Sequence, residues 1–350
     1  MIRASFALVF LLALEATETS LGEAPRLDDE ISLGKAMFSD RNLSADRTVS
    51  CSLCHQPGFS FAEGRILSAG VGGRTEVRKT PSLLDLPAYR SFFWDGRAPS
   101  LQDQIRGPFL SRVELGFDSE DEVLHRVKQN PSYVRAFQRL YHVGASDISF
   151  EHVARALVAF ERAIPSRPLR IDRFLGGDFT ALSFQARQGM EIFKGKGRCS
   201  VCHVITERTA PLTDNQYHAS SLDARLSVRQ LHDLTAVVSG LDERERFRRI
   251  SSDPQVSELG RFVVTLQPAD IGKFRTPSLR NAAGAYHSYM HDGSISSLKD
   301  AIDQEVDFRS RELGYPPKLS RTERDEIRIF LEEVSQALVT ARSQIDGDAR

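Results

Sequence analysis

Apolar residues along this chain recur mainly at the three- and four-residue spacing of an α-helix. One helical face is formed by Val153, Ala156, Leu157, Phe160 and Ile164. A second follows a capping box of Ser320 and Glu323 and consists of Ile327, Phe330, Leu331, Val334 and Leu338. Alternating patterns typical of strands are weak. The pattern predicts an all-α fold with long loops and little strand.

A charged stretch, residues 222–258, interrupts the second half of the chain. Its apolar positions are Leu226, Leu231, Leu234, Val237 and Val238. They predict at least one amphipathic helix. Such a helix either contacts a partner or packs on the protein with a solvated face, and the second is the more usual case.

The N-terminus has the pattern of a secretory signal: Arg3, an uncharged apolar run over 4–14, then polar and small residues. We expect cleavage after Ala16 or Ala24, which assigns 1–24 to the signal. The alternative is a buried N-terminal helix. The run is too short to span a bilayer, and no cysteine precedes Cys51, so we expect an exported, periplasmic protein without a membrane anchor. A net charge of −1 gives no electrostatic case for binding nucleic acid.

All four cysteines fall in two copies of one pattern, CSLCH at 51–55 and CSVCH at 199–203. Disulfides, a zinc site or a redox-active pair would each leave the histidine after the second cysteine unexplained. C-x-x-C-H is the attachment signal for c-type haem. We therefore predict two covalently bound haem c groups, attached through Cys51 and Cys54 and through Cys199 and Cys202. His55 and His203 would then ligate iron.

The rest of the chain also repeats. Gly-x-x-x-Phe precedes both haem motifs, at 34–38 and 189–193, and the segment 79–105 parallels 275–302. Trp94 in the first copy corresponds to His291 in the second. The repeat predicts two related, cytochrome c-like haem domains, 25–165 and 166–350.

Three segments are distinctive enough to indicate a protein family: FFWDGR (92–97), LTDNQYH (212–218) and GKFRTPSLRN followed by YMHDG (272–293). Over residues 28–340 the chain resembles the bacterial di-haem cytochrome c peroxidase family, including its MauG-like branch. The resemblance implies that the N-terminal haem meets hydrogen peroxide and that the C-terminal haem transfers electrons. It also implies that Trp94 links the two.

Two catalytic residues follow from the same resemblance, ten and twenty residues after Trp94. Cleavage of the O–O bond of peroxide requires a proton to move from one oxygen to the other. Glu114 would shuttle that proton, and the Gln104 amide would orient the peroxide. Without the resemblance, both would be ordinary solvated residues.

Three positions depart from the family. The loop between His55 and Trp94 lacks the histidine that caps the resting N-terminal iron in many relatives, so we expect an open iron site. Glu305 stands where relatives place a methionine or tyrosine ligand of the C-terminal haem. It either ligates iron or lies on the surface, with Tyr315 as another candidate.

Calcium between the haems is doubtful. Lys79 replaces an asparagine ligand of the family. The other expected ligands are the backbone carbonyls of Tyr286 and Ser288, which are present whatever the side chain.

These features predict an exported enzyme that uses hydrogen peroxide to oxidise a partner. The partner would be a small redox protein or a side chain of a protein substrate, and the open iron site favours the second. The alternative is a periplasmic electron-transfer cytochrome without catalysis, which would need both axial positions of each iron filled by protein.

Overall fold

The computed structural model describes residues 27–165, 168–220, 227–283, 288–312 and 318–335. In these parts the chain is mostly helical, with one two-stranded sheet in which β1 (Tyr217–Ala219) pairs antiparallel with β2 (Lys273–Arg275). The predicted fold class is therefore confirmed. The expected signal segment 1–24, with Ala16 and Ala24, lies outside the described residues.

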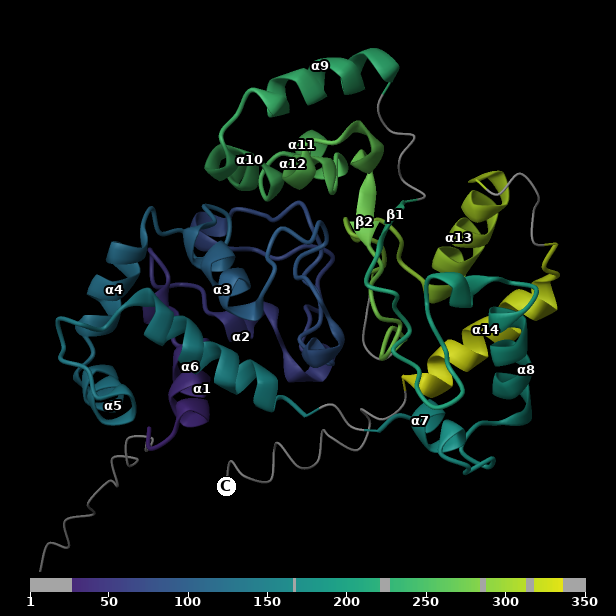
Figure 1. Cartoon of the computed structure of the whole chain (residues 1–350), viewed down its shortest axis with the longest axis horizontal. Coiled ribbons are helices and arrows are strands. Elements are labelled where there is room, and N and C mark those ends of the chain that lie inside the picture. Colours follow the sequence, from purple (N-terminus) through teal and green to yellow (C-terminus); the bar gives the residue numbers. More distant parts are fainter. Residues whose placement is uncertain (1–26, 166–167, 221–226, 284–287, 313–317, 336–350) are drawn as a thin grey trace, which may run out of the picture.

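The helices of the first half include the first C-x-x-C-H motif itself (Figure 1). They are α1 (Glu30–Ser39), α2 (Cys51–Cys54), α3 (Leu101–Leu110), α4 (Glu120–Lys128), α5 (Pro131–Tyr141) and α6 (Phe150–Ala163). The second half contains α7 (Arg170–Leu175), α8 (Phe184–Lys194), α9 (Val228–Ser239), α10 (Glu243–Ile250), α11 (Pro254–Glu258), α12 (Phe262–Thr265), α13 (Leu298–Glu312) and α14 (Arg321–Val334).

The repeat in the sequence is a repeat in the structure. In the first half α1 crosses α6 so closely that a Cβ on Gly34 would lie 2.0 Å from the carbonyl oxygen of Ala156. In the second half α8 crosses α14 in the same way, and a Cβ on Gly189 would lie 1.9 Å from the Glu326 oxygen. Both Gly-x-x-x-Phe segments therefore mark the closest approach of two core helices.

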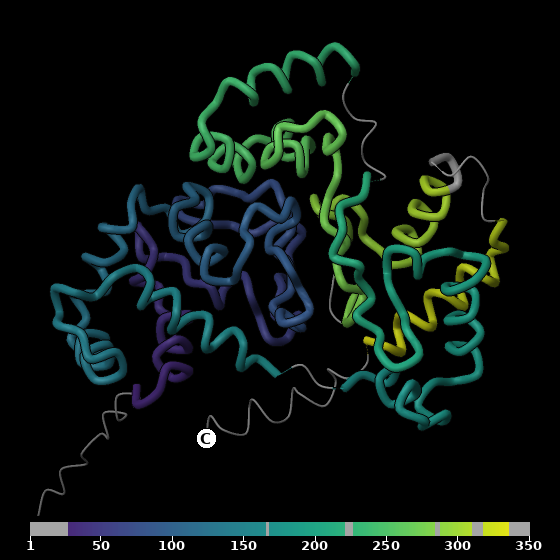
Figure 2. Tube along the Cα trace, in the orientation of Figure 1, coloured from purple at the N-terminus to yellow at the C-terminus, as the bar shows by residue number. Residues whose placement is uncertain are grey.

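The predicted helical faces are buried at these crossings. Val153, Ala156 and Leu157 on α6 are at most 1% exposed, and the capping box of Ser320 and Glu323 begins α14. Each half has its own apolar core, one within 27–164 and one within 169–334. Figure 2 shows the two halves side by side along the trace. The division into two domains near residue 166 stays a prediction. Leu338 lies outside the described residues.

Helices α9 to α12 form a separate group with a third apolar cluster (Figure 1). The amphipathic helix expected within 222–258 is confirmed, because Leu231 and Leu234 of α9 pack against that cluster. Val237 was wrongly placed on the apolar face: it is 52% exposed, because it lies on the side of α9 that faces away from the cluster. Leu226 lies outside the described residues.

This group contacts the first half of the chain, because Arg244 of α10 donates a 2.8 Å hydrogen bond to the Asp118 carbonyl. In the described part of the chain, no helix combines the length and apolar character needed to cross a membrane.

Candidate functional site

The first C-x-x-C-H motif forms a single helical turn, α2, and ends at His55. The Nδ1 atom of His55 lies 2.9 Å from the Phe61 carbonyl oxygen, so this nitrogen carries the proton and donates it. Nε2 is then left with its lone pair for a metal. Burial lowers the pKa of His55 to about 4, which keeps the imidazole neutral at ordinary pH.

The second motif has the same geometry. The Nδ1 atom of His203 lies 2.9 Å from the Leu212 carbonyl oxygen, and burial lowers the pKa of this histidine also to about 4. The cysteines of both motifs are unpaired thiols. Two free thiols followed by a neutral, oriented imidazole are the donor set that c-type haem requires.

The residues predicted for the N-terminal site come together. Cys51, Cys54, His55, Trp94, Gln104 and Glu114 all line one cavity. Among the described residues that line it, His55 is the only histidine, and there is no methionine. Apart from His55, the described lining residues therefore include neither of the two side chains, histidine and methionine, that fill the axial positions of haem c.

The distal candidates are positioned by α3. Gln104 lies in the first turn of this helix, whose N-cap Ser100 accepts a hydrogen bond from the Asp103 amide. Glu114 lies in the turn that follows, fixed by a 3.1 Å bond from its own amide to the Ser111 carbonyl. Burial raises the pKa of Glu114, so its carboxyl holds a proton more readily than an exposed glutamate and suits proton transfer.

Trp94 lies at the junction of the two halves. It lines the first cavity and also a second one, whose lining residues come from 79–94, 275–282 and 288–290. Its indole Nε1 donates a 2.8 Å hydrogen bond to the Lys79 carbonyl, and its own carbonyl accepts a 2.7 Å bond from the Arg275 amide. Trp94 therefore contacts segments of both halves of the chain, and its role as an electron-transfer link stays a prediction.

Several buried ionic residues of this junction were not predicted. Asp95 is fully buried and pairs with both Arg78 and Arg97, and Arg78 also donates a 2.8 Å bond to the Ser257 hydroxyl of α11. The aspartate belongs to the Asp-Gly pair that recurs in both halves, which is the signal that could have identified it.

Glu76 and Glu161 also line the first cavity. Burial raises the pKa of Glu161 to about 8. No sequence pattern distinguishes Glu76 or Glu161 from an ordinary surface glutamate, so neither could be predicted.

Glu305 lies on α13, and its carboxylate forms a 3.5 Å ion pair with Arg309. Its side chain is 38% exposed. Burial, with a further contribution from the negative charge of Glu305, raises the pKa of the Cys199 thiol to about 12. The carboxylate is therefore close enough to act on the second attachment motif, although its role as a ligand stays a proposal. Tyr315 lies outside the described residues.

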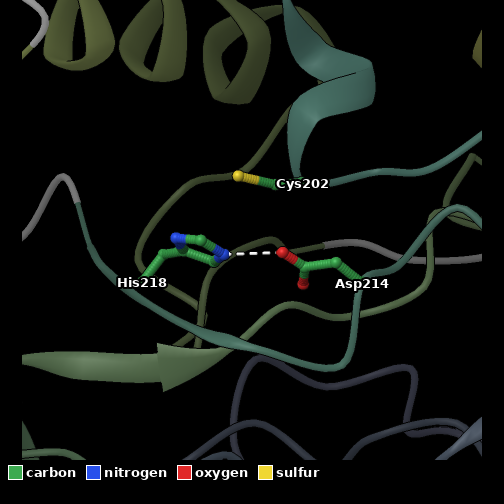
Figure 3. A group of neighbouring side chains, drawn as sticks. All are labelled: Cys202, Asp214 and His218. Atoms are coloured by element: carbon green, nitrogen blue, oxygen red, sulfur yellow. Dashed lines mark hydrogen bonds and ion pairs between the residues drawn. The ribbon is translucent and has the colours of Figure 1, made fainter.

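Figure 3 shows a cluster of Cys202, Asp214 and His218, whose potential ligand atoms lie within 4.8 Å of one another. His218 Nε2 lies 2.7 Å from Asp214 Oδ2. Hydrogen bonding with Cys202, followed by that with Asp214, raises the pKa of His218 to about 9. Because the Cys202 sulfur belongs to the attachment motif, we assign the cluster to the surroundings of the second haem and not to a separate metal ion.

Lys79 also lies at the junction and is buried, with 4% of the residue exposed. Burial lowers the pKa of its ammonium group. The Lys79 amide donates a 2.8 Å bond to the His291 carbonyl, which ties together the two segments expected to surround calcium. Ser288 is buried there, whereas Tyr286 lies outside the described residues.

Comparison with known proteins gives a consistent result. The profile of a family described as di-haem cytochrome c peroxidase matches residues 28–180. The cytochrome-c peroxidase IdrP2 of Denitromonas iodatirespirans is 32% identical over 321 residues, covering 88% of this chain and 82% of that protein. The methylamine utilization protein MauG of Methylorubrum extorquens is 32% identical over 314 residues, with 88% and 78% covered.

Solved structures agree on the fold. The diheme peroxidase BthA from Burkholderia thailandensis superposes with a TM-score of 0.70 at 21% identity, over 88% of this chain and 86% of that one. A MauG-like protein associated with microbial copper homeostasis gives a TM-score of 0.68 at 24% identity, over 89% and 90%.

Proposed function

Because this chain belongs to the di-haem cytochrome c peroxidase family, we propose that it is an exported, periplasmic enzyme that reduces hydrogen peroxide with electrons from a side chain of a partner protein. One observation carries the proposal. Gln104 and Glu114 line the same cavity as the Cys51, Cys54 and His55 attachment motif.

Haem c at this motif would supply an iron that binds peroxide and accepts its oxidising equivalents. The protein supplies the proton transfer. Glu114 accepts the proton of one peroxide oxygen and returns it to the other, which leaves as water. The Gln104 amide holds the peroxide by hydrogen bonds while this happens. Complete reduction to two water molecules then takes two electrons and two protons.

The electrons pass through the second site and Trp94. His203, with Cys199 and Cys202, would hold the second haem, and Glu305 would supply a further, oxygen ligand to its iron. A carboxylate oxygen is a hard donor that favours ferric over ferrous iron, so it would lower the reduction potential. A centre of lower potential is harder to reduce and easier to oxidise, so it would disfavour electron entry from a weak reductant and favour the storage of oxidising equivalents taken from peroxide.

The cavity favours a protein side chain as the electron source. With no second histidine and no methionine among its described lining residues, the first site supports an iron that is open in the oxidised protein. A small redox protein is the second candidate, since relatives of this chain are cytochrome-c peroxidases. An electron carrier without catalysis is disfavoured, because a carrier needs both axial positions filled.

The test uses the holoprotein with both haems attached. Peroxide consumption is followed for the native protein, for Glu114→Gln and for the control Glu122→Gln, which alters an exposed residue of α4. We expect Glu114→Gln to slow consumption by about 10²–10⁴ while the control leaves it unchanged. Unchanged consumption by Glu114→Gln would overturn the catalytic assignment. If the holoprotein instead oxidised added reduced cytochrome c quickly and steadily, the electron donor would be a small redox protein and not a protein side chain.

A further inference from the structure

The loop over 68–76 packs directly against the backbone of the proposed catalytic glutamate. The Val71 amide donates a 3.0 Å hydrogen bond to the Glu114 carbonyl. A Cβ on Gly70 would lie 1.9 Å from the Val113 oxygen, so only glycine allows this approach. The loop is thus held in a fixed position beside Glu114.

The same loop contains Glu76, whose carboxyl group is the second one beside Glu114 in the lining of the cavity. The Glu76 amide is bound to the Ser68 carbonyl at 3.0 Å, and a bridge between Ala69 and Thr75 closes the loop just before it. The Glu76 side chain hydrogen-bonds that of Glu114, while its Oε1 atom is buried without a hydrogen-bond partner in the described structure. Two carboxyl groups that hydrogen-bond each other must hold a proton between them.

We propose that Glu76 shares one proton with Glu114 and so acts as a positioning residue, keeping the Glu114 carboxylate ionised and aimed as the proton acceptor for peroxide. This inference rests on the proposed function. Burial raises the pKa of both groups. The adjacent Glu114 raises that of Glu76 further, whereas the bond from Glu76 lowers that of Glu114. Glu76 is then the protonated partner.

The charged residues around Glu76 and Glu114 explain why the two carboxyl groups retain one proton between them. Arg97 lowers the pKa of both carboxyl groups and Arg78 that of Glu76, but Arg97 already forms a 2.7 Å ion pair with buried Asp95, and Arg78 pairs with the same aspartate. The pair therefore lacks a cation of its own, and two ionised carboxylates side by side repel strongly. The other charged residues of the packed segments, Asp46, Arg74 and Arg112, are exposed to solvent.

Two other basic side chains line the cavity, those of Lys79 and Arg275. The acidic group that acts on Lys79 is Glu63, whereas the Arg275 guanidinium lies over the Tyr89 ring and donates a 3.3 Å bond to the Phe93 carbonyl, so both are engaged elsewhere.

The other titratable groups of the cavity supply no cation either. The thiols of Cys51 and Cys54 are committed to the haem. Glu63, near Cys54, is buried and pairs with Arg65 at 2.8 Å. Glu161 lies near Cys51 and is itself an acid, so it adds no positive charge.

The first experiment is the pH profile of peroxide consumption by the holoenzyme. Glu76→Leu removes the donor, so the pKa of Glu114 rises and the acid limb moves to higher pH by about one to two units, the effect of one hydrogen bond to a charged group. In Glu76→Gln the side-chain amide can still donate a hydrogen bond to Glu114, so the acid limb of its pH profile moves less. The control Glu63→Gln alters a buried glutamate that pairs with Arg65, and its limb stays in place.

The second experiment needs no turnover. Infrared spectra of the resting holoprotein at neutral pH should show a carboxylic-acid C=O band that Glu76→Gln removes. Glu161→Gln identifies the separate band of Glu161. The inference is overturned if Glu76→Leu leaves the acid limb in place, or if Glu76→Gln leaves the band unchanged. These failures differ from failure of the proposed function, in which Glu114→Gln itself would consume peroxide at the native rate.

Discussion

Replacing Gly34 by alanine tests whether the crossing of α1 and α6 holds the N-terminal site together. The new Cβ would lie 2.0 Å from the Ala156 carbonyl oxygen and 2.8 Å from Cβ of Phe160. A carbon and a carbonyl oxygen approach to about 3.3 Å at closest, so the helices must separate by roughly 1 Å. Forcing extra volume into a packed core costs about 1–3 kcal/mol, and the better helix propensity of alanine returns about 0.5–1 kcal/mol.

We therefore expect Gly34→Ala to lower the free energy of unfolding by about 1 kcal/mol. Denaturant unfolding of the holoprotein, followed by far-ultraviolet circular dichroism, measures it. The effect reaches the site, because α1 also carries Phe38, whose ring centroid lies 6.2 Å from that of His55. The haem absorption of the N-terminal site should shift as well.

The matched control is Gly58→Ala, where an added Cβ meets nothing within 4 Å. Its stability should be unchanged or slightly increased. If Gly34→Ala were as stable as Gly58→Ala and kept the native haem spectrum, the reasoning about the helix crossing would be refuted.

Three further predictions concern the sites. Replacing both Cys51 and Cys54 by serine should leave one covalent haem per chain by mass spectrometry, and a mass with two would refute the assignment. Glu305→Met should raise the potential of the C-terminal haem in a redox titration, because thioether sulfur favours ferrous iron, and an unchanged midpoint would place Glu305 on the surface. Glu161, whose pKa burial raises to about 8, favours the folded state at low pH, and this contribution is lost as pH rises from its unfolded value of about 4.3 through 8. Glu161→Gln should therefore gain stability relative to the native protein over that range, and parallel stability curves would contradict this.

The parts of the structure that could be predicted are those with a local or repeated pattern. The periodic face of α6 and the capping box of α14 identify their helices, because spacing and capping act within a few residues. The C-x-x-C-H motifs identify both haem sites, because attachment chemistry fixes the spacing of thiols and imidazole.

Residues that function through tertiary contacts could not be predicted. Glu76 reaches Glu114 only because a glycine loop packs on the backbone of 113–114, and no local pattern encodes that contact. The apolar character of Val237 was misleading for the same reason. Its exposure depends on how α9 is rotated against the α9–α12 group.

The central claim is that the N-terminal iron site is ready for peroxide without prior reduction. The direct measurement is the rate of peroxide consumption by the native holoprotein, once fully oxidised and once with the C-terminal haem reduced beforehand. Because no histidine other than His55 and no methionine lines the described cavity, the account predicts that the oxidised protein reacts as fast as the half-reduced protein. An oxidised protein that is inert until reduced would contradict it, since a protein ligand would then have to leave the iron first.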